Sequence, residues 1–328
     1  MARCLVTGVA GFIGSHLAEQ LIRTGHHVVG VDAFTSYYPE RFKRANLTAL
    51  SADSSFELIE ANLLDLQLGE LMADVEYVFH EAAQAGVRAC WGDSFSTYVD
   101  NNILGTQRLL EAAKDAKLRK FVFASTSSIY GDAESDGTPE TAVPNPISPY
   151  GVSKLAAEHL CRLYGLHFHV PTIILRYFTV YGPRQRPDMA FHKFIKAMLC
   201  DEDLALYGDG NQSRDFTYID DIVAANMLAM DSDVSGEVMN IGGGSRVTIN
   251  ETLSLLSELT GVRPRIQYLS QTAGEVRRTA ADISKAKQLL SYQPQYRLRD
   301  GLRKEVEWLS GLYETRQPAT AAASRFSI

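Results

Sequence analysis

Short apolar runs alternate with longer amphipathic segments along the first half of the chain. The apolar runs include CLVTG, HVVGVD, VEYVFH, KFVFAS and TIILR, and segments such as FIGSHLAEQLIRTG and NNILGTQRLLEAAKDA between them have apolar positions at helical spacing. Buried strands that alternate with helices are typical of βαβ units, in which helices cover both faces of a parallel sheet. The pattern predicts an α/β fold, a doubly wound, Rossmann-like parallel sheet with helices on both faces.

The pattern changes after TIILR. Loops rich in Gly, Pro and Arg, such as YGPRQRPDM and YGDGNQSRDF, are mixed with helical segments, and strand-like runs are too few for a second parallel sheet. We expect residues 1–178 to form the Rossmann-like domain, with a returning segment around 215–242. Residues 179–314 should form a smaller mixed domain for the substrate. The small, polar and aperiodic segment 315–328 is expected to be a flexible tail.

Composition and charge narrow the range of partners. The chain has 328 residues, of which 45% are hydrophobic and 22% charged, as in ordinary globular proteins. Its net charge of -7 argues against nucleic acid or an anionic membrane as a partner, because both require clustered positive charge. The four cysteines have no metal-ligand spacing, which predicts reduced core thiols and no metal site. No apolar stretch approaches the ~20 residues of a membrane helix, so we expect a cytoplasmic enzyme.

A glycine-rich turn follows the first predicted strand. Gly8, Gly11 and Gly14 have the spacing G-x-x-G-x-x-G and precede an amphipathic helix. Glycines there allow the backbone to approach a pyrophosphate, which binds at the N-terminus of the helix. The next strand ends at Asp32, whose carboxylate would bind the ribose of NAD and repel the 2′-phosphate of NADP. These residues predict an NAD site; the alternative is a structural turn beside a surface aspartate.

A tyrosine and a lysine stand four residues apart in SPYGVSKLAAEHL. Tyr150 and Lys154 would lie on one face of a helix and point into the same cleft. The Lys154 ammonium, together with the positive nicotinamide ring, would lower the pKa of Tyr150 toward neutrality. Tyr150 could then act as the general base for an alcohol whose hydride passes to NAD.

These motifs together resemble the extended short-chain dehydrogenase/reductase superfamily over residues 1 to about 312. The resemblance implies bound NAD, a small C-terminal domain for a nucleotide sugar, and often a homodimer through helices, here within 98–117 and 150–164. It also implies a catalytic hydroxyl at Thr126, next to Ser125. The cofactor-binding residues that it implies are Gly8, Gly11, Phe12, Ile13, Gly14, Asp32, Asn62, Leu63, Ala82, Ala83, Ser125, Tyr150, Lys154 and Tyr177.

The second half of the chain resembles NAD-dependent nucleotide-sugar epimerases and decarboxylases. The resemblance places Arg214 and Arg277 at the diphosphate, which suits planar guanidinium groups, and Leu206 and Tyr207 at the uracil. The alternative for the arginines is a set of structural ion pairs with nearby aspartates, namely Asp215, Asp220 or Asp282.

Three segments are similar to UDP-glucuronate 4-epimerases in particular. They are GPRQRPDMAF, AGVR around Arg88, and the tyrosine-rich DAFTSYYPERFK. Thr179 stands where UDP-glucose 4-epimerases usually have Asn. This difference disfavours a UDP-glucose 4-epimerase, which is kept as the main alternative. A non-catalytic NAD-sensing regulator is a further one, although such regulators typically lack the Tyr/Lys pair.

The serines after Thr126 indicate which reaction follows oxidation at C4. Ser127 and Ser128 stand where related dehydratases carry Asp and Glu, and related UDP-glucuronate decarboxylases carry Glu in place of Ser128. Dehydration and decarboxylation are therefore disfavoured, and 4-epimerisation of UDP-glucuronate to UDP-galacturonate is predicted.

Oxidation of a glucuronate at C4 gives a β-keto acid, which readily loses CO2. Neutral hydroxyls of Thr126, Ser127, Ser128 and Thr179, with the charge of Arg186, could hold the carboxylate out of alignment for that loss. The alternative for the serines is simple capping of the strand end. Glu81 replaces the leucine usual in the family, and the resemblance assigns it no role.

Overall fold

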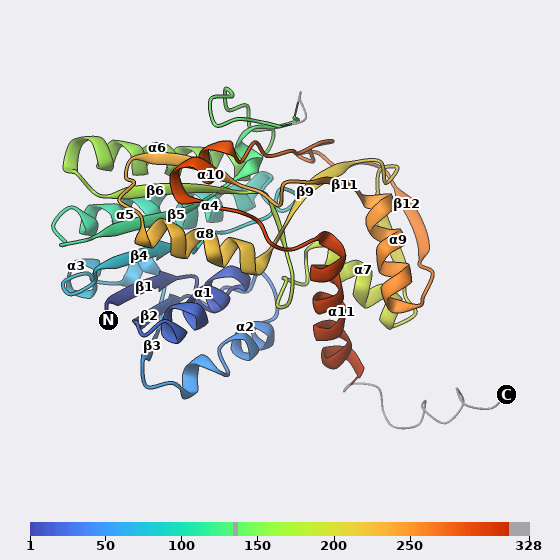
Figure 1. The fold of residues 1–328 in the computed structure, drawn as a ribbon, viewed down its shortest axis with the longest axis horizontal. Helices are drawn as coiled ribbons and strands as arrows, with labels where there is room; N and C mark the ends of the chain where they lie inside the picture. The colour runs from blue at the N-terminus through green and yellow to red at the C-terminus, as the bar shows by residue number, and fades with distance from the viewer. Residues whose placement is uncertain (134–136, 315–328) are drawn as a thin grey trace.

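The structure is a computed structural model that describes residues 1–133 and 137–314 (Figure 1). The tail predicted at 315–328 lies outside the described residues. Within the described part of the chain, no helix combines the length and the apolar character needed to cross a bilayer. All four cysteines are free thiols, and three of them are buried.

A seven-stranded sheet forms the core of the larger part of the molecule, in the order β10-β6-β5-β4-β1-β2-β3. Every pairing in it is parallel, as the alternating pattern predicts, so the doubly wound α/β fold is confirmed. The strand order reverses between β1 and β4, and ligands of such sheets bind at that point, beyond the carboxyl ends of the strands. The strands are β1 (Arg3–Thr7), β2 (His27–Asp32), β3 (Phe56–Glu60), β4 (Tyr77–His80), β5 (Lys120–Thr126), β6 (Thr172–Tyr177) and β10 (Glu237–Ile241).

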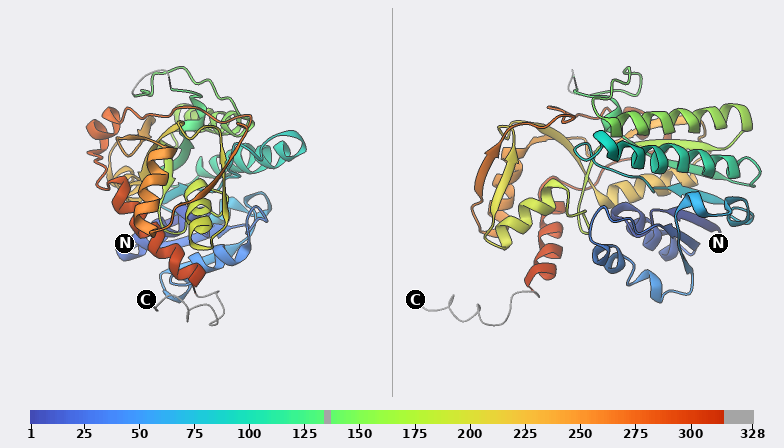
Figure 2. Two further views of the ribbon diagram at one scale, coloured as in Figure 1. Left: turned by 90° about the vertical axis from the view of Figure 1, so that its right-hand side faces the viewer. Right: turned by 180° about the vertical axis from the view of Figure 1, so that it is seen from behind.

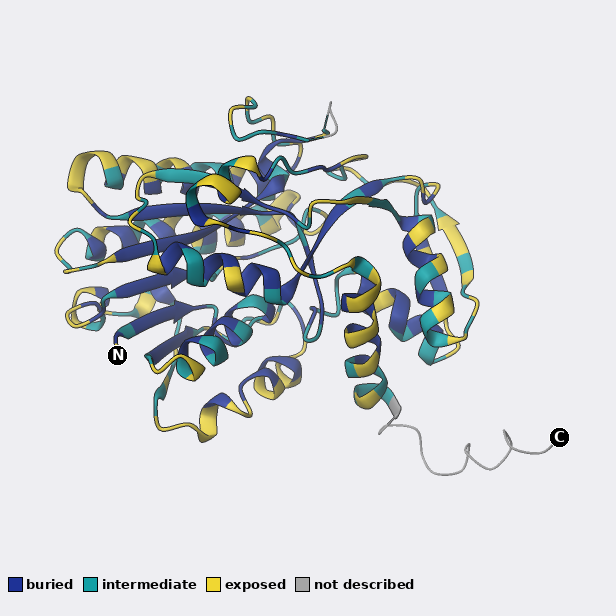
Figure 3. Cartoon of the chain, in the orientation of Figure 1, coloured by how far each residue is buried: buried dark blue, intermediate teal, exposed yellow. Residues whose placement is uncertain are grey.

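Helices cover both faces of this sheet (Figures 1 and 2). Successive side chains of a strand point to opposite faces. In β1, Cys4 and Val6 accordingly pack in the cluster that contains helix α1, whereas Leu5 packs in the cluster that contains α5 and α6. Figure 3 shows the inner strands of the sheet buried and the outer helix faces exposed. The helices on the first face include α1 (Phe12–Arg23), α8 (Ile219–Asp231) and α10 (Ser284–Leu290); those on the second are α3 (Leu68–Leu71), α5 (Gly105–Ala113) and α6 (Pro149–Phe168).

Helix α6 carries the predicted Tyr/Lys pair and begins where the sequence indicates. Ser148 caps it by accepting a hydrogen bond from the Gly151 N–H at 3.1 Å, and Pro149 occupies the first turn, where no N–H is needed. The helix ends at His169, which has the left-handed conformation. The side chains of residues 150–164 are therefore held on a regular, capped helix.

The segment expected to be one helix over 98–117 is less regular. It consists of α4 (Phe95–Tyr98), a π-helical turn (Val99–Leu104) and α5, which ends at Ala113. The π turn widens the helix at Asn102, whose amide donates to the Gln84 carbonyl and to the Ser153 hydroxyl, both at 2.9 Å. Such turns are frequent at functional sites.

The second half of the chain forms a smaller mixed part. It contains the three-stranded sheet β11-β9-β7 and the parallel pair β12-β8. Residues 219–241 return to the large sheet as α8 and β10, so the two parts are interleaved. The elements of the smaller part are β7 (Thr179–Tyr181), α7 (Ala190–Leu199), β8 (Asp203–Tyr207), β9 (Ser213–Tyr218), β11 (Arg246–Thr248), α9 (Ile249–Thr260), β12 (Arg265–Leu269) and α11 (Leu298–Glu314).

Short helical elements complete the loops of the larger part. They are α2 (Glu40–Asn46) and the 3-10 turns η1 (Leu50–Ala52), η2 (Leu63–Asp65), η3 (Gly92–Ser94) and η5 (Ser127–Ile129). The last of these follows β5 directly and presents the serine pair at the carboxyl edge of the sheet.

Candidate active site

A long cavity runs along the carboxyl edge of the large sheet. Every residue for which the sequence predicts a cofactor contact lines it, from the glycine turn through Asp32 to Tyr150, Lys154 and Tyr177. The sequence analysis missed several other lining residues, although the tyrosine-rich segment after Asp32 pointed to some of them. They include Thr35, Tyr37, Tyr38, Lys43, Gln84 and Asn101.

The glycine turn has the geometry that an anion site needs. Gly8 has φ +71°, and a Cβ there would lie 2.8 Å from the backbone of Ala82, so the position requires glycine. A Cβ at Gly14 would lie 2.3 Å from the Gly8 carbonyl oxygen. Helix α1 begins after Gly11 without a side-chain cap, so its first N–H groups remain available to a ligand. The turn therefore fits the pyrophosphate of a dinucleotide.

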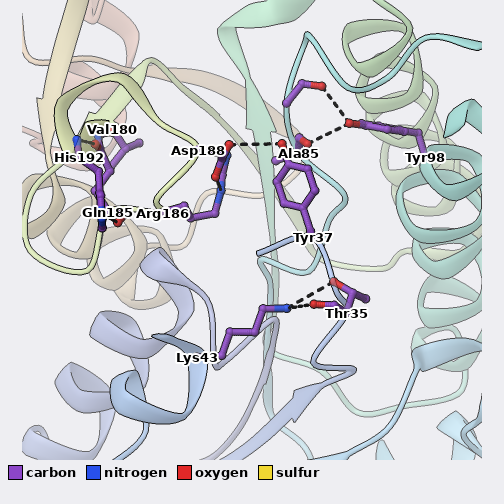
Figure 4. Close-up of polar contacts among 11 residues, drawn as sticks. Thr35, Tyr37, Lys43, Ala85, Tyr98, Val180, Gln185, Arg186, Asp188 and His192 are labelled. Carbon is purple, nitrogen blue, oxygen red and sulfur yellow. Dashed lines mark hydrogen bonds and ion pairs between the residues drawn. The ribbon is translucent and has the colours of Figure 1, made fainter. Parts of the chain in front are cut away.

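Asp32 is held rigidly at the next strand end. Its carboxylate accepts hydrogen bonds from the Ala10 N–H at 3.0 Å and the Phe34 N–H at 2.8 Å. Burial raises the pKa of Asp32, and these two bonds and the charge of Lys43 oppose that rise. Lys43 in turn donates to the Thr35 carbonyl at 2.7 Å (Figure 4). A carboxylate and an ammonium therefore face this end of the cavity together.

Asn62 lies farther along the same end. Its side-chain oxygen accepts from the Leu64 N–H at 3.0 Å and caps η2. An amide oxygen has two lone pairs, so one acceptor position is left for an adenine amine. Asn62 therefore offers the acceptor that the cofactor prediction needs.

Tyr150, Thr126 and Lys154 meet at the opposite end of the cavity. Tyr150 and Thr126 are joined by a hydrogen bond between their hydroxyls. Burial raises the pKa of Tyr150, while the Thr126 hydrogen bond and the charge of Arg186 lower it. The net shift is opposite to the expected lowering because the loss of solvation outweighs the two favourable contacts.

Lys154 is buried beneath Tyr150 on the same helix face. Its ammonium lies 4.2 Å from the centre of the Phe123 ring. Burial lowers the pKa of Lys154 to about 8, and the nearby carboxylate of Glu81 opposes that fall. In the protein itself, the charge of Lys154 is therefore balanced chiefly by Glu81.

The two hydroxyls at the end of β5 have different surroundings. Ser125 donates to Glu158 at 2.9 Å, and Glu158 is also paired with Arg176 in a buried network. Thr126 instead faces Tyr150 and accepts from the Ser128 N–H at 3.1 Å, which caps η5. Thr126 is thus the hydroxyl in contact with the phenol, whereas the Ser125 hydroxyl is held by Glu158.

A second cavity adjoins the reactive end of the first. It shares Ser125, Tyr150, Tyr177 and Arg186 with the first cavity. Predicted sugar-binding residues from three segments line it, namely Ser127, Ser128, Thr179, Arg186 and Arg214. A ligand in this cavity would therefore contact both Tyr150 and the row of hydroxyls.

Arg186 is oriented by a partner in the same loop. Its guanidinium forms two hydrogen bonds with Asp188, both 3.0 Å long, and Tyr37 donates to Asp188 at 3.3 Å (Figure 4). Gln185 fixes the loop by donating to the Val180 carbonyl at 3.1 Å. The contact between Tyr37 and Asp188 joins the loop after β2, which lines the first cavity, to the loop of Arg186, which lines both cavities.

Four predicted substrate residues lie outside the lining of the second cavity. Leu206 is buried in the core, because alternate residues of β8 point inward. The Arg88 guanidinium stacks 4.0 Å from the centre of the Tyr207 ring and pairs with Glu275, which does line the cavity. Arg277 is exposed and pairs with Asp209 at 2.9 Å.

The structure places the two arginines predicted at the diphosphate in different surroundings. Arg214 reaches the second cavity and donates to the Ser213 and Arg277 carbonyls at 2.9 and 3.3 Å. The acid that pairs with Arg277 is Asp209, which the sequence analysis did not consider.

Comparison with known proteins places these features in a family. The sequence model of the NAD dependent epimerase/dehydratase family matches residues 4–242. A crystal structure of UDP-glucuronic acid 4-epimerase from Bacillus cereus, in complex with UDP-glucuronic acid and NAD, is 48% identical with a TM-score of 0.93; the match covers 95% of this chain and 100% of that chain. An uncharacterized UDP-glucose epimerase of Bacillus subtilis is 46% identical over 95% of this chain and 99% of its own length. A UDP-glucuronate 4-epimerase of Thermodesulfobacterium geofontis is 39% identical over 94% of this chain and 96% of its own.

Proposed function

We propose, because the chain belongs to the NAD-dependent epimerase/dehydratase family, that it is a UDP-glucuronate 4-epimerase, which interconverts UDP-glucuronate and UDP-galacturonate. The observation that carries this choice of substrate is the second cavity. There, three neutral hydroxyl side chains and the Arg186 guanidinium surround a space next to Tyr150. The hydroxyl side chains are those of Ser127, Ser128 and Thr179. Such a lining suits a sugar that carries a carboxylate.

Tyr150 is the general base of the proposed reaction. The positive nicotinamide ring of bound NAD and the Lys154 ammonium would offset the rise in the pKa of Tyr150 that burial causes. The phenolate then accepts the proton of the C4 hydroxyl, and Thr126 orients the two oxygens through its hydrogen bond. Bound NAD supplies a hydride acceptor at C4 and later a hydride donor. After the 4-keto sugar has turned over, Tyr150 returns its proton to the oxygen on the new configuration, and no net oxidation results.

Retention of the intermediate requires a firm anchor away from C4. We assign this to Arg214, which lies in the second cavity, since a guanidinium binds phosphate oxygens through two parallel hydrogen bonds. The hydroxyl row and Arg186 hold the carboxylate, so that the bond to CO2 stays out of alignment with the ketone. We therefore expect epimerisation without loss of carbon.

A homodimer in the cytoplasm completes the proposal. Helix α6 exposes large apolar side chains, including Leu163 and Leu166, on its outer face, and an exposed apolar patch of this kind supports an interface with a second copy. The unpaired cysteines agree with a reducing compartment.

Product analysis tests the assignment. Purified protein is incubated separately with UDP-glucuronate and with UDP-glucose, and the products are separated. We expect UDP-galacturonate from the first substrate. Turnover of UDP-glucose alone would assign the chain to the alternative epimerase, and CO2 as the main product would assign it to the decarboxylases.

A further inference from the structure

Glu81 is a carboxylate that the proposed reaction does not use. It follows β4 directly, and its side chain lines the cofactor cavity. It accepts a hydrogen bond from the Tyr177 hydroxyl at 2.9 Å. The Asn226 amide donates to the same hydroxyl at 2.7 Å, and the Asn226 side-chain oxygen lies 3.0 Å from it. The carboxylate is thus held in one orientation by neighbours from β6 and α8.

The positive charge that faces Glu81 is the ammonium of Lys154 on helix α6. Burial raises the pKa of Glu81 to about 7, and the Tyr177 hydrogen bond and the charge of Lys154 lower it. In the same way, Glu81 opposes the fall in the pKa of Lys154 that burial causes. Each group therefore favours the charged form of the other across the reactive end of the cavity.

The acids of the cavity are divided between its two ends. Among the described residues that line it, the acidic side chains are Asp32 and Glu81. Asp32 lies at the glycine turn, where its charge is balanced by Lys43. Glu81 lies with Tyr150, Lys154 and Tyr177 at the reactive end, which the nicotinamide must reach for a hydride to pass to and from the sugar.

We propose that Glu81 is a counter-charge that favours oxidised over reduced NAD at the reactive end, and that it thereby shortens the lifetime of the 4-keto sugar; the second part rests on the proposed epimerase function. The nicotinamide ring is positive when oxidised and neutral when reduced. A fixed carboxylate in a poorly solvated cavity stabilises the positive form. Lys154 alone would favour the neutral form, and Glu81 offsets this.

The chemistry of the reaction is unchanged by this role. In the oxidation half, the C4 hydrogen leaves with its electron pair to the cofactor, and the hydroxyl proton passes to Tyr150. In the second half both return to the sugar, and above pH 7, where Glu81 is ionised, it neither gains nor loses a proton or an electron. Its charge shifts the balance between the two halves toward the hydroxyl sugar, so that less β-keto acid is present to dissociate or lose CO2.

The variant Glu81→Gln tests the charge separately from the hydrogen bond. Glutamine keeps an acceptor for Tyr177 and has nearly the same volume, so a purely structural role predicts no change. The measurement is the ratio of the affinities for NADH and NAD, obtained by competitive exchange of bound cofactor without any sugar, at a pH above 7 where Glu81 is ionised. We expect the ratio to rise about tenfold in the variant, as for the loss of one nearby charge at a moderate effective dielectric constant. Glu70→Gln, an exposed site on α3 with the same change in net charge, should leave the ratio unchanged.

A second readout uses the complete enzyme with UDP-glucuronate. Absorbance of reduced nicotinamide should show a larger reduced fraction at equilibrium in Glu81→Gln than in the wild type. Glu81→Leu should shift both readouts in the same direction, and it serves as the test if the glutamine variant does not fold.

An affinity ratio within about twofold of the wild-type value in a folded variant would overturn the proposal, because one buried charge is expected to change it more. Since the exchange contains no sugar, that result would leave the epimerase function standing, and a failure to convert UDP-glucuronate would leave the exchange result standing.

Discussion

Tyr150 differs from phenylalanine by the one oxygen on which the proposed proton transfer depends. We predict that Tyr150→Phe lowers kcat by at least about a hundredfold, the lower range for loss of a general base, while NAD stays bound. Turnover of UDP-glucuronate and the content of bound cofactor are the measurements. Tyr164→Phe is a matched control farther along α6, where the hydroxyl contacts Glu111 and Gln107 rather than the cavity. A Tyr150→Phe enzyme as active as the Tyr164→Phe control would contradict the mechanism.

Lys154 gives the reaction a predicted dependence on pH. Burial lowers the pKa of its ammonium to about 8, and the charge of Glu81 makes the largest contribution in the opposite direction. The ammonium is present below this pH and is lost as the pH rises through it, so kcat/KM should fall on the alkaline side. Glu81→Gln should move this fall to lower pH. A profile that stays flat well above pH 8 would show that the charge of Lys154 is not needed.

The hydroxyl row is predicted to control the loss of CO2. Ser128→Ala and Thr179→Val each remove one neutral donor from the second cavity. A hydrogen bond of about 1 kcal/mol corresponds to about a fivefold change in partition between epimerised and decarboxylated product. Each variant should therefore release about five times more CO2 per epimerisation, measured from labelled UDP-glucuronate. CO2 release at the wild-type level in both variants would argue against a carboxylate clamp.

At the scale of single residues, motifs locate what lies on regular elements better than what lies on loops. The glycine turn, Asp32, Tyr150 and Lys154 have fixed spacings to strand ends and helix starts, and the structure brings them into one cavity. Asp188 was missed because its contact with Tyr37 joins loops 151 residues apart in sequence. No local sequence pattern predicts a contact between two loops so far apart in the chain.

At the scale of elements, alternation predicts strands and helices but not their local irregularities. The segment over 98–117 has helical spacing, yet residues 99–104 form a π turn. The cause is tertiary: the Asn102 side chain bonds to Gln84 and Ser153, which belong to a loop and to another helix. A sequence window that contains only the helix itself has no signal for this.

Helix α11 carries a buried carboxyl group, Glu305, that should make the stability of the fold depend on pH. Glu305 is fully buried; one oxygen accepts from the Gly182 N–H at 2.9 Å, and within the described residues the other has no hydrogen-bond partner. Burial raises the pKa of Glu305 well above its ordinary value. The folded state therefore binds a proton more tightly than the unfolded state, and stability is lost as the pH rises above the unfolded pKa toward the folded one.

Glu305→Gln should remove this loss, because the amide is neutral at every pH and keeps the acceptor for Gly182. We expect the variant to be more stable than the wild type near pH 7, by about 1–3 kcal/mol, and the difference to shrink toward pH 5. Thermal unfolding over this pH range measures it. Parallel curves for the two proteins would show that Glu305 does not titrate in this range.

At the scale of the whole molecule, the chain is interleaved rather than divided at one point. A boundary near residue 178 follows from the change in composition, and β7 does begin a different sheet at Thr179. However, α8 packs on α1, and β10 pairs with β6 at the edge of the large sheet. A returning segment around 215–242 was expected from the sequence, whereas the pairing partner of β10 was not, because parallel neighbours far apart in sequence leave no local pattern.

The outer face of α6 leads to a prediction about assembly. Leu163 and Leu166 are exposed on this helix, the second by 71%, whereas Tyr150 and Lys154 on its inner side line the cavity. If a second copy covers the outer face, the double variant Leu163→Glu, Leu166→Glu would bury four charges in the symmetric interface instead of four leucines. Each buried leucine contributes about 1.5–3 kcal/mol, so association should weaken by at least about a thousandfold. Light scattering after size exclusion should show a dimer for the wild type and a monomer for the variant, with NAD still bound.

Val143→Glu, an exposed apolar site in a loop, is the control and should remain a dimer. A wild-type protein that is monomeric at high concentration, or a double variant that is still dimeric, would remove α6 as the interface.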